Sequence, residues 1–275
     1  MALVARLAPR KPRKIPLARY PLAIELGYRA MLRGLVADYQ RAALEELNQN
    51  RPLILAEVKM YSFDADSGPQ PRGWAARLAD MLLRVAERIT TSLVSGLNKV
   101  AEFSANIDVF NRSEWQKQVR AAYGVDILRG EPQLASRLEA WEAENIALIR
   151  SIPETLSGQL RGVLTKGFSE GQSLKDLTKL VQERTGVARN RAELIARDQV
   201  GKLNGQLTEM RQRNIGIDSY VWRTSQDERV RPTHRVKNGK MFKWGDHPQP
   251  GEEIRCRCIA EPIFPSDLTG EVQRI

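Results

Sequence analysis

The chain has 275 residues, of which 42% are hydrophobic and 28% charged, and this suits one large globular domain or two modest ones. Its formal net charge of +10 favours an acidic partner, most commonly nucleic acid, although a solvated basic surface gives the same composition. No apolar run reaches the roughly 20 residues that span a bilayer, no secretory signal is visible, and 2 cysteines make no disulfide framework, so we expect synthesis in a reducing cytoplasm and no membrane partner.

The first 21 residues combine repeated prolines with basic residues and contain no acid. Because proline cannot continue a helix, residues 1–21 are predicted to form an extended basic arm. Four of its side chains are candidate contacts to nucleic-acid phosphates: Arg10, Lys11, Arg13 and Lys14. A disordered tail is the alternative interpretation.

Residues 22–187 are predicted to form a helical body. Apolar residues at steps of three and four predict a helix from Leu22 to about Asn50, ended by Arg51-Pro52. A continuous apolar stripe over residues 78–100 predicts a second helix whose stripe faces the core or a partner. Residues 113–123 are predicted to form a short helix that ends at Gly124.

Two more helices are predicted in this body. Pro132 opens the first, and Pro153 interrupts it or begins a successor. The segment Ser173-Leu174-Lys175-Asp176 has the form of a capping box and begins the second, which is predicted to end near Gly186.

A long helix over residues 188–213 is predicted to open the C-terminal unit, residues 188–265. Gly201 and Gly205 leave one face of this helix bare, and because glycine costs about 1 kcal/mol in a helix interior, we expect a close contact there. Arg197 and Asp198 form either a surface pair or a buried pair that braces the unit.

After Gly216 the apolar period changes to two, which is typical of strands. Short strands are predicted over residues 220–224, over residues 240–244 after the Asn238-Gly239 turn, and from Cys258 onward. Residues 266–275 form a tail. The expected fold class is therefore mainly α, with a small C-terminal α+β unit made of one long helix and short antiparallel strands.

The strand that carries Cys256 and Cys258 is a candidate metal centre. Residues two apart on a strand point to the same face, so one ion can reach both sulfurs. His234 follows a predicted turn and supplies an imidazole, and Asp227 or His247 supplies a fourth ligand. The hypothesis is a tetrahedral, structural zinc site, since a unit of short strands buries too little apolar surface to hold itself together.

Other interpretations of the same cluster stay open. The two cysteines could be small apolar core residues. A metal-dependent nuclease is the competing functional interpretation, although the chain has only 2 histidines and no paired carboxylates or Ser/His/Asp arrangement stands out. Five arginines surround the cluster and form either a DNA-facing patch or a network with carboxylates: Arg229, Arg231, Arg235, Arg255 and Arg257.

The ordered motifs of the C-terminal half resemble the phage Mu protein F-like family, the minor head proteins of tailed bacteriophages. The resemblance covers about residues 150–265. It rests on the segments Ala192–Arg197, Trp222-Arg223-Thr224, Asp227–His234, Asn238-Gly239, Pro250-Gly251 and Cys256-Arg257-Cys258. Many members carry a histidine shortly before the Cys-Arg-Cys, where this chain has residues 251–255 without one.

This resemblance implies a structural, non-enzymatic protein of the virion that is assembled in the host cytoplasm. It implies a position inside the phage head at or near the portal, with portal, major capsid and scaffold proteins as partners. It also implies a role in procapsid assembly and in DNA packaging or delivery, with non-specific contact to the phage genome.

Overall fold

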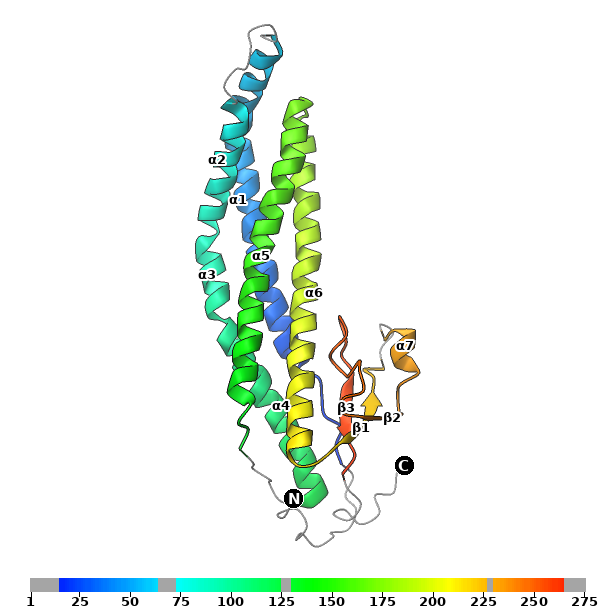
Figure 1. The fold of residues 1–275 in the computed structure, drawn as a ribbon. Helices are drawn as coiled ribbons and strands as arrows, with labels where there is room; N and C mark the ends of the chain where they lie inside the picture. The colour runs from blue at the N-terminus through cyan, green and yellow to red at the C-terminus, as the bar shows by residue number, and fades with distance from the viewer. Residues whose placement is uncertain (1–14, 64–72, 125–129, 227–229, 265–275) are drawn as a thin grey trace. The chain divides into compact units, whose positions relative to one another are not determined.

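The computed structural model describes residues 15–63, 73–124, 130–226 and 230–264, and it shows a mainly helical chain with a small antiparallel sheet near the C-terminus (Figure 1). None of the helices in these ranges combines the length and the apolar character needed to cross a bilayer. The predicted phosphate contacts Arg10, Lys11, Arg13 and Lys14 lie outside the described residues.

Long helices make up most of the chain, and the apolar residues predicted to face inward are buried along them. The helix bounds are α1 Leu22–Phe63, α2 Gly73–Arg88, α3 Thr90–Asn98, α4 Val100–Tyr123, α5 Leu134–Ser169 and α6 Leu174–Asn214. The helical stripe predicted over residues 78–100 is interrupted at Ile89 and Lys99, although Ile89 keeps its backbone bond to Val85 at 3.2 Å. The short helix predicted over residues 113–123 is the end of α4, and it stops at Gly124 as expected.

Two prolines do not end their helices, which corrects the predicted boundary at Pro52 and both alternatives predicted at Pro153. Each lies inside a helix, in α1 and α5 respectively. Leu47 and Ile54 are wholly buried around Pro52, and Ile152 and Leu156 are buried beside Pro153. Proline costs about 3 kcal/mol in a helix interior, and several buried side chains at about 1.5–3 kcal/mol each outweigh that cost.

The predicted start of α6 is confirmed and its predicted end is wrong. The Ser173 hydroxyl accepts the backbone N–H of Asp176 at 3.2 Å, as a helix cap does. The helix does not end near Gly186 but continues without interruption to Asn214. The boundary predicted between residues 187 and 188 therefore falls inside α6.

The three predicted strands form one antiparallel sheet in the order β2-β1-β3. The strands are β1 Ser219–Arg223, β2 Met241–Lys243 and β3 Ile259–Pro262, and the one-turn helix α7 Pro232–Arg235 follows β1. Tyr220 pairs with Phe242 on one side and Pro262 on the other. Alternate residues of β1 are buried, which is the period-two pattern seen in the sequence.

The chain divides into two compact units. Unit 1 comprises residues 1–27, 101–143 and 196–275, and unit 2 comprises residues 28–100 and 144–195. In unit 2 the Tyr28 hydroxyl donates to the Asn145 carbonyl oxygen at 2.7 Å, and the Tyr39 and Ser157 hydroxyls lie 2.6 Å apart.

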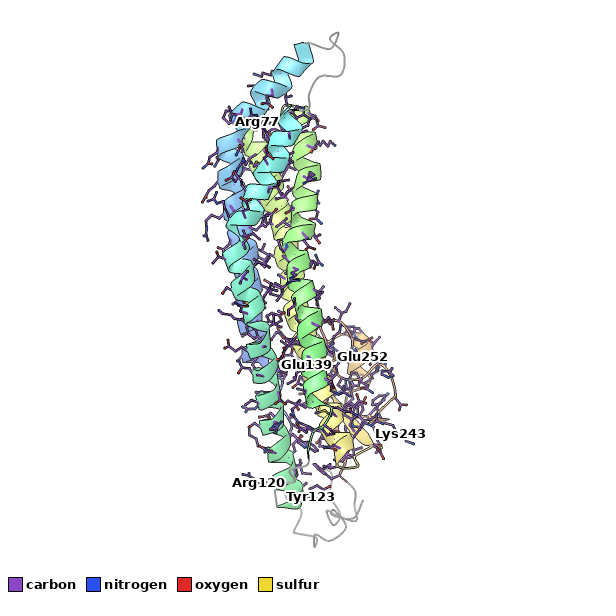
Figure 2. All side chains as sticks on the ribbon, turned by 60° about the vertical axis from the view of Figure 1, so that its left-hand side comes forward. Arg77, Arg120, Tyr123, Glu139, Lys243 and Glu252 are labelled. Carbon is purple, nitrogen blue, oxygen red and sulfur yellow. The ribbon has the colours of Figure 1, made fainter. Side chains whose placement is uncertain are left out.

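Unit 1 contains the sheet and two clusters of buried residues. The first cluster joins the end of α4 to the segments that flank the sheet: Trp115, Val119, Tyr123, Ile215, Ile217 and Phe264. Tyr123 lies at the C-terminal end of α4 (Figure 2), where its ring meets Phe264 edge-on at 5.2 Å. The second cluster is formed by the sheet itself together with the two cysteines: Tyr220, Trp222, Trp244, Cys256, Cys258 and Ala260.

Residues 15–21, the last part of the predicted arm, are packed within unit 1. Ile15 packs against the first cluster, and the Gln118 amide donates to the Pro16 carbonyl at 3.1 Å. The Arg19 guanidinium donates to Glu114 at 3.0 Å. Burial raises the pKa of Glu114, but the hydrogen bonds from Arg19 and Lys117 outweigh it and lower the pKa overall. Residues 15–21 therefore contact other residues of the same chain.

Candidate metal centre

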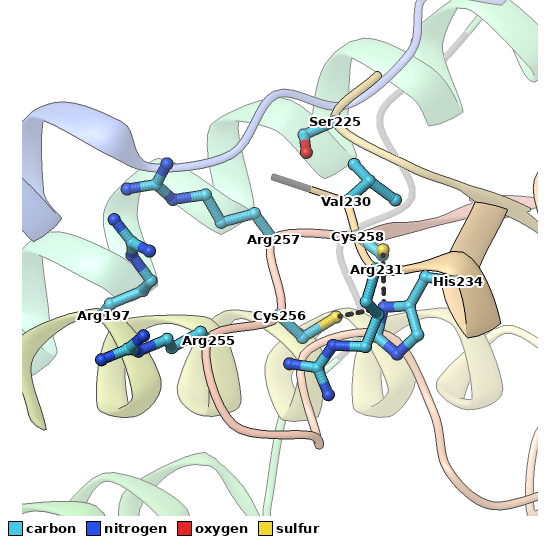
Figure 3. Close-up of a pocket in the computed structure, with 9 residues that line it drawn as sticks. All are labelled: Arg197, Ser225, Val230, Arg231, His234, Arg255, Cys256, Arg257 and Cys258. Carbon is cyan, nitrogen blue, oxygen red and sulfur yellow. Dashed lines mark hydrogen bonds between the residues drawn. The ribbon is translucent and has the colours of Figure 1, made fainter. Parts of the chain in front are cut away.

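Three of the predicted metal ligands converge in unit 1. His234 is placed by α7, while Cys256 and Cys258 lie at the entrance to β3, and all three side chains are buried. Their ligand atoms lie within 4.8 Å of one another. The His234 Nδ1 atom lies 3.7 Å from the Cys256 Sγ atom and 3.4 Å from the Cys258 Sγ atom (Figure 3).

These separations fit a tetrahedral zinc ion. With Zn–S near ~2.3 Å and Zn–N near ~2.0–2.1 Å, tetrahedral angles place a sulfur and a nitrogen ligand about 3.6 Å apart. The two observed nitrogen–sulfur distances, 3.7 and 3.4 Å, lie on either side of this value. Two thiolates and an imidazole are also the donors that zinc prefers, so the residues present fit the metal.

The second nitrogen of His234 has a carboxylate partner. Its Nε2 atom contacts Glu253, which also accepts from Arg231 at 3.4 Å. The hydrogen bond with His234 is the main reason that the pKa of Glu253 is lowered. A carboxylate on the outer nitrogen fixes the imidazole so that Nδ1 faces the sulfurs, as in many zinc sites.

The two sulfurs share an environment that favours ionisation of one of them. The Cys258 thiol lowers the pKa of Cys256 to about 6, and the backbone N–H of Gly251, 3.3 Å from the Cys256 sulfur, acts in the same direction. The pKa of Cys258 is raised, because it holds the proton beside Cys256 and is buried, while the Trp222 indole N–H acts in the opposite direction. That N–H is buried with no hydrogen-bond partner among the described residues. A metal-bound thiolate at Cys258 would give it an acceptor, which is a second sign that the site fits a metal.

The predicted close contact at Gly201 and Gly205 is confirmed, and it positions the cysteine loop. A Cβ atom at Gly201 would lie 2.7 Å from the Cys256 carbonyl oxygen, and one at Gly205 would meet the Pro250 carbonyl oxygen even more closely. On the loop side, Gly251 has φ +91° and touches both helix glycines. The bare face of α6 therefore lets the loop backbone lie directly on the helix.

Arg197 and Asp198 do not pair with each other, which corrects both predicted alternatives. Arg197 turns to the wholly buried Glu25 at 3.5 Å, and Asp198 pairs with Lys202 at 2.8 Å. Glu25 also accepts from the Arg257 guanidinium at 2.9 Å, so this carboxylate ties the start of α1 to the Cys-Arg-Cys loop. Burial by itself raises the pKa of Glu25, but the hydrogen bonds from Arg257 outweigh it, and the pKa is lowered.

Of the two candidates for a fourth ligand, His247 is not part of this group. His247 is exposed, and its Nδ1 atom lies 2.8 Å from a Glu252 oxygen, which raises the pKa of His247. Asp227 lies outside the described residues. The sequence reasoning missed the contact of Glu253 with His234, the effect of the Trp222 indole on Cys258 and the role of Glu25. A carboxylate three residues before Cys256 was the available signal for Glu253.

Comparison with known proteins confirms the resemblance seen in the motifs. Residues 158–261 match a family model described as phage Mu protein F like protein, and this segment belongs to that family. It includes His234, Cys256 and Cys258. No solved structure matches the chain.

Two similar proteins are described as uncharacterized. One, from Haemophilus influenzae, is 32% identical over 202 residues, covering 70% of this chain and 45% of that protein. The other, from Methanocaldococcus jannaschii, is 32% identical over 125 residues, covering 45% of this chain and 19% of that protein. The chain therefore spans less than half the length of these relatives.

Proposed function

Residues 158–261 belong to the phage Mu protein F-like family, and on this basis we propose that the protein is a minor capsid and head morphogenesis protein of a tailed bacteriophage. The family match is the observation that carries the proposal. We place the protein in the virion, inside the head at or near the portal, where it acts in procapsid assembly and in DNA packaging or delivery. Portal, major capsid and scaffold proteins are its proposed partners.

We propose that zinc at His234, Cys256 and Cys258 has a structural role. The strands of the sheet are only 5, 3 and 4 residues long. Such short strands bury little apolar surface, and a bound metal offsets this by linking distant segments. His234 follows β1 and the cysteines precede β3, so one ion would fix both loops against the sheet.

The net charge of +10 supports contact with the phage genome. Contacts from lysine and arginine to phosphate give affinity without sequence preference, which suits a head filled with DNA. We expect DNA affinity to fall steeply as the salt concentration rises. Binding that does not depend on salt would contradict this part of the proposal.

A structural role is also preferred to the nuclease alternative. No carboxylate is found among the described residues that line the cavity beside the three ligands. The second histidine, His247, lies apart from them and is engaged with Glu252. Both nitrogens of His234 have partners, Nδ1 in the two sulfurs and Nε2 in Glu253, which disfavours His234 as a general base for DNA hydrolysis.

The proposed function is tested by quantitative mass spectrometry of purified virions and procapsids. We expect a few to some tens of copies per particle, counted against the major capsid protein. Absence from both particles would refute the assignment. Metal-dependent cleavage of DNA that is lost in H234A would then support the nuclease.

Zinc binding is tested separately, by elemental analysis of protein purified without a histidine tag. We expect nearly one zinc per chain in the wild type and background levels in C256S and H234A. H247A is the matched control, since His247 is exposed and outside the ligand group. A background level of zinc in the wild type would indicate that the two cysteines are core residues and not metal ligands.

A further inference from the structure

A cavity of about 220 Å³ lies beside the three metal ligands and is lined by four arginines: Arg197, Arg231, Arg255 and Arg257. These arginines come from three places in unit 1, namely α6, the segment before α7 and the Cys-Arg-Cys loop. In the close-up of the cavity, Arg231 lies beside His234, and the other three arginines lie to the left of the two sulfurs (Figure 3). The metal centre and the arginines therefore share one opening.

Among the described residues, the arginines of the cavity outnumber the carboxylates that pair with them. Arg197 and Arg257 share the single carboxylate of Glu25. Arg231 pairs with Glu253, whose carboxylate also contacts His234. In the described ranges, three of the four guanidinium groups thus contact two carboxylates, and Arg255 contacts none.

The four arginine side chains differ in how far they are exposed to solvent. The side chains of Arg197 and Arg257 are 18% and 16% exposed, and that of Arg231 is 38% exposed. Arg255 is exposed and has no hydrogen bond or ion pair with any residue in the described ranges. The deeper guanidinium groups are held in place, and an anion that enters would meet Arg255 first.

The backbone at Arg255 is unusual for this residue type. Its φ is +63°, in the left-handed region that favours glycine or asparagine. An arginine with no hydrogen bond or ion pair among the described residues is thus kept in a conformation that glycine would adopt with less strain. This strain is consistent with a role for the guanidinium at the cavity.

We propose that this cavity binds a phosphate group. Arginine is the residue that proteins use to bind phosphate, because its planar fork gives paired, charge-assisted hydrogen bonds. A carboxylate offers two oxygens in one plane and is satisfied by one or two such forks. A phosphate offers more acceptors in three dimensions and suits several arginines that line one space. The inference rests on the proposed function only for the source of the phosphate, which would be the backbone of the packaged genome.

The test uses the full chain, titrated calorimetrically with inorganic phosphate at low ionic strength, against acetate at the same ionic strength. R255G removes the guanidinium while relieving the backbone, so it should melt no lower than the wild type. R255K keeps the charge without the fork. R161A is the control, since Arg161 is an exposed arginine of α5 in unit 2 and its substitution removes the same charge.

We expect the wild type to bind phosphate saturably and acetate much more weakly. R255G should weaken phosphate binding about tenfold, as expected for the loss of a charge-assisted hydrogen bond. R255K should fall in between, and R161A should match the wild type. Absence of saturable phosphate binding would overturn the proposal, as would equal weakening by R161A or equal binding of acetate, which would indicate a carboxylate ligand.

A labelled duplex oligonucleotide distinguishes the sources of the phosphate. If R255G weakens both duplex and inorganic phosphate binding while R161A does not, the nucleic-acid backbone is the ligand. If only inorganic phosphate binding weakens, the cavity binds a small phosphate compound. Absence of the protein from virions would refute the proposed function and leave the phosphate result standing.

Discussion

The contact between α6 and the cysteine loop can be tested by adding a single methyl group. In G201A the new Cβ atom would lie 2.7 Å from the Cys256 carbonyl oxygen, a distance that real Cβ atoms essentially never show. The atom it meets belongs to the backbone, so the loop itself must move. Because this loop carries Cys256, the same change should disturb the metal centre.

The expected magnitude follows from two opposing effects. Alanine is favoured over glycine in a helix interior by about 1 kcal/mol. Overpacking a tight contact costs about 1–3 kcal/mol, and backbone is less able to yield than a flexible side chain. We therefore expect G201A to lower the free energy of unfolding by about 1 kcal/mol, with a similar or larger loss in G205A, whose Cβ would lie closer to the backbone.

Gly186 provides the control in the same helix. A Cβ atom there would have no neighbour within 4 Å, so only the gain in helix propensity remains. G186A should be stabilised by up to about 1 kcal/mol, opposite in sign to G201A. Urea unfolding measures the stability, and competition with a chelator measures zinc affinity, which should fall in G201A and stay unchanged in G186A. If G201A were as stable as G186A and kept its zinc affinity, the described contact would be wrong.

Three further results are expected. E253Q should bind zinc about 10–100-fold more weakly while keeping the same stoichiometry, because the carboxylate orients His234; unchanged affinity in chelator competition would remove that role. W222F should also weaken zinc binding, by a smaller factor, because it deletes the buried N–H beside Cys258, and an unchanged affinity would show that this donor does not act on the metal. E25Q should cost about 3 kcal/mol near neutral pH, since it leaves the half-buried guanidinium of Arg257 without its anion. Because the pKa of Glu25 is lowered on folding, its carboxylate stabilises the folded state above the ordinary carboxyl pKa of about 4.3, and this stabilisation is lost as the pH falls through the pKa of the folded state. The difference in unfolding free energy between wild type and E25Q, measured in urea, should therefore shrink below about pH 4. A constant difference would contradict this.

Some of these features could be read from local patterns alone. The spacing of apolar residues indicated the helices and the three strands, because a helix or strand that buries one face repeats its apolar residues with a period set by its own local geometry. The capping role of Ser173 is equally local, since donor and acceptor are three residues apart. The same holds for the pair of glycines, which indicated that something would approach α6 closely.

Other features depended on contacts between distant segments. Pro52 and Pro153 predicted helix breaks, because the cost of proline in a helix interior can be judged from the local sequence. The burial of the neighbouring side chains, which offsets that cost, depends on tertiary packing. Arg197 stands next to Asp198 in the sequence but pairs with Glu25, which only the docking of the N-terminal segment brings near. Likewise, only the tertiary structure showed that the segment packed on Gly201 is the backbone of the loop at Cys256.

The sequence by itself indicated three donors of the candidate metal centre and the family of residues 158–261. Two cysteines two residues apart and one histidine are enough to name the donors, because metal chemistry depends on residue type. Only the tertiary structure decided that the His234 Nδ1 atom faces both sulfurs and that Glu253, 19 residues away along the chain, contacts the other nitrogen. It also brought four arginines to the same opening. The physical reason is that ligand type is a property of each side chain, whereas distance and orientation follow from how the whole unit packs.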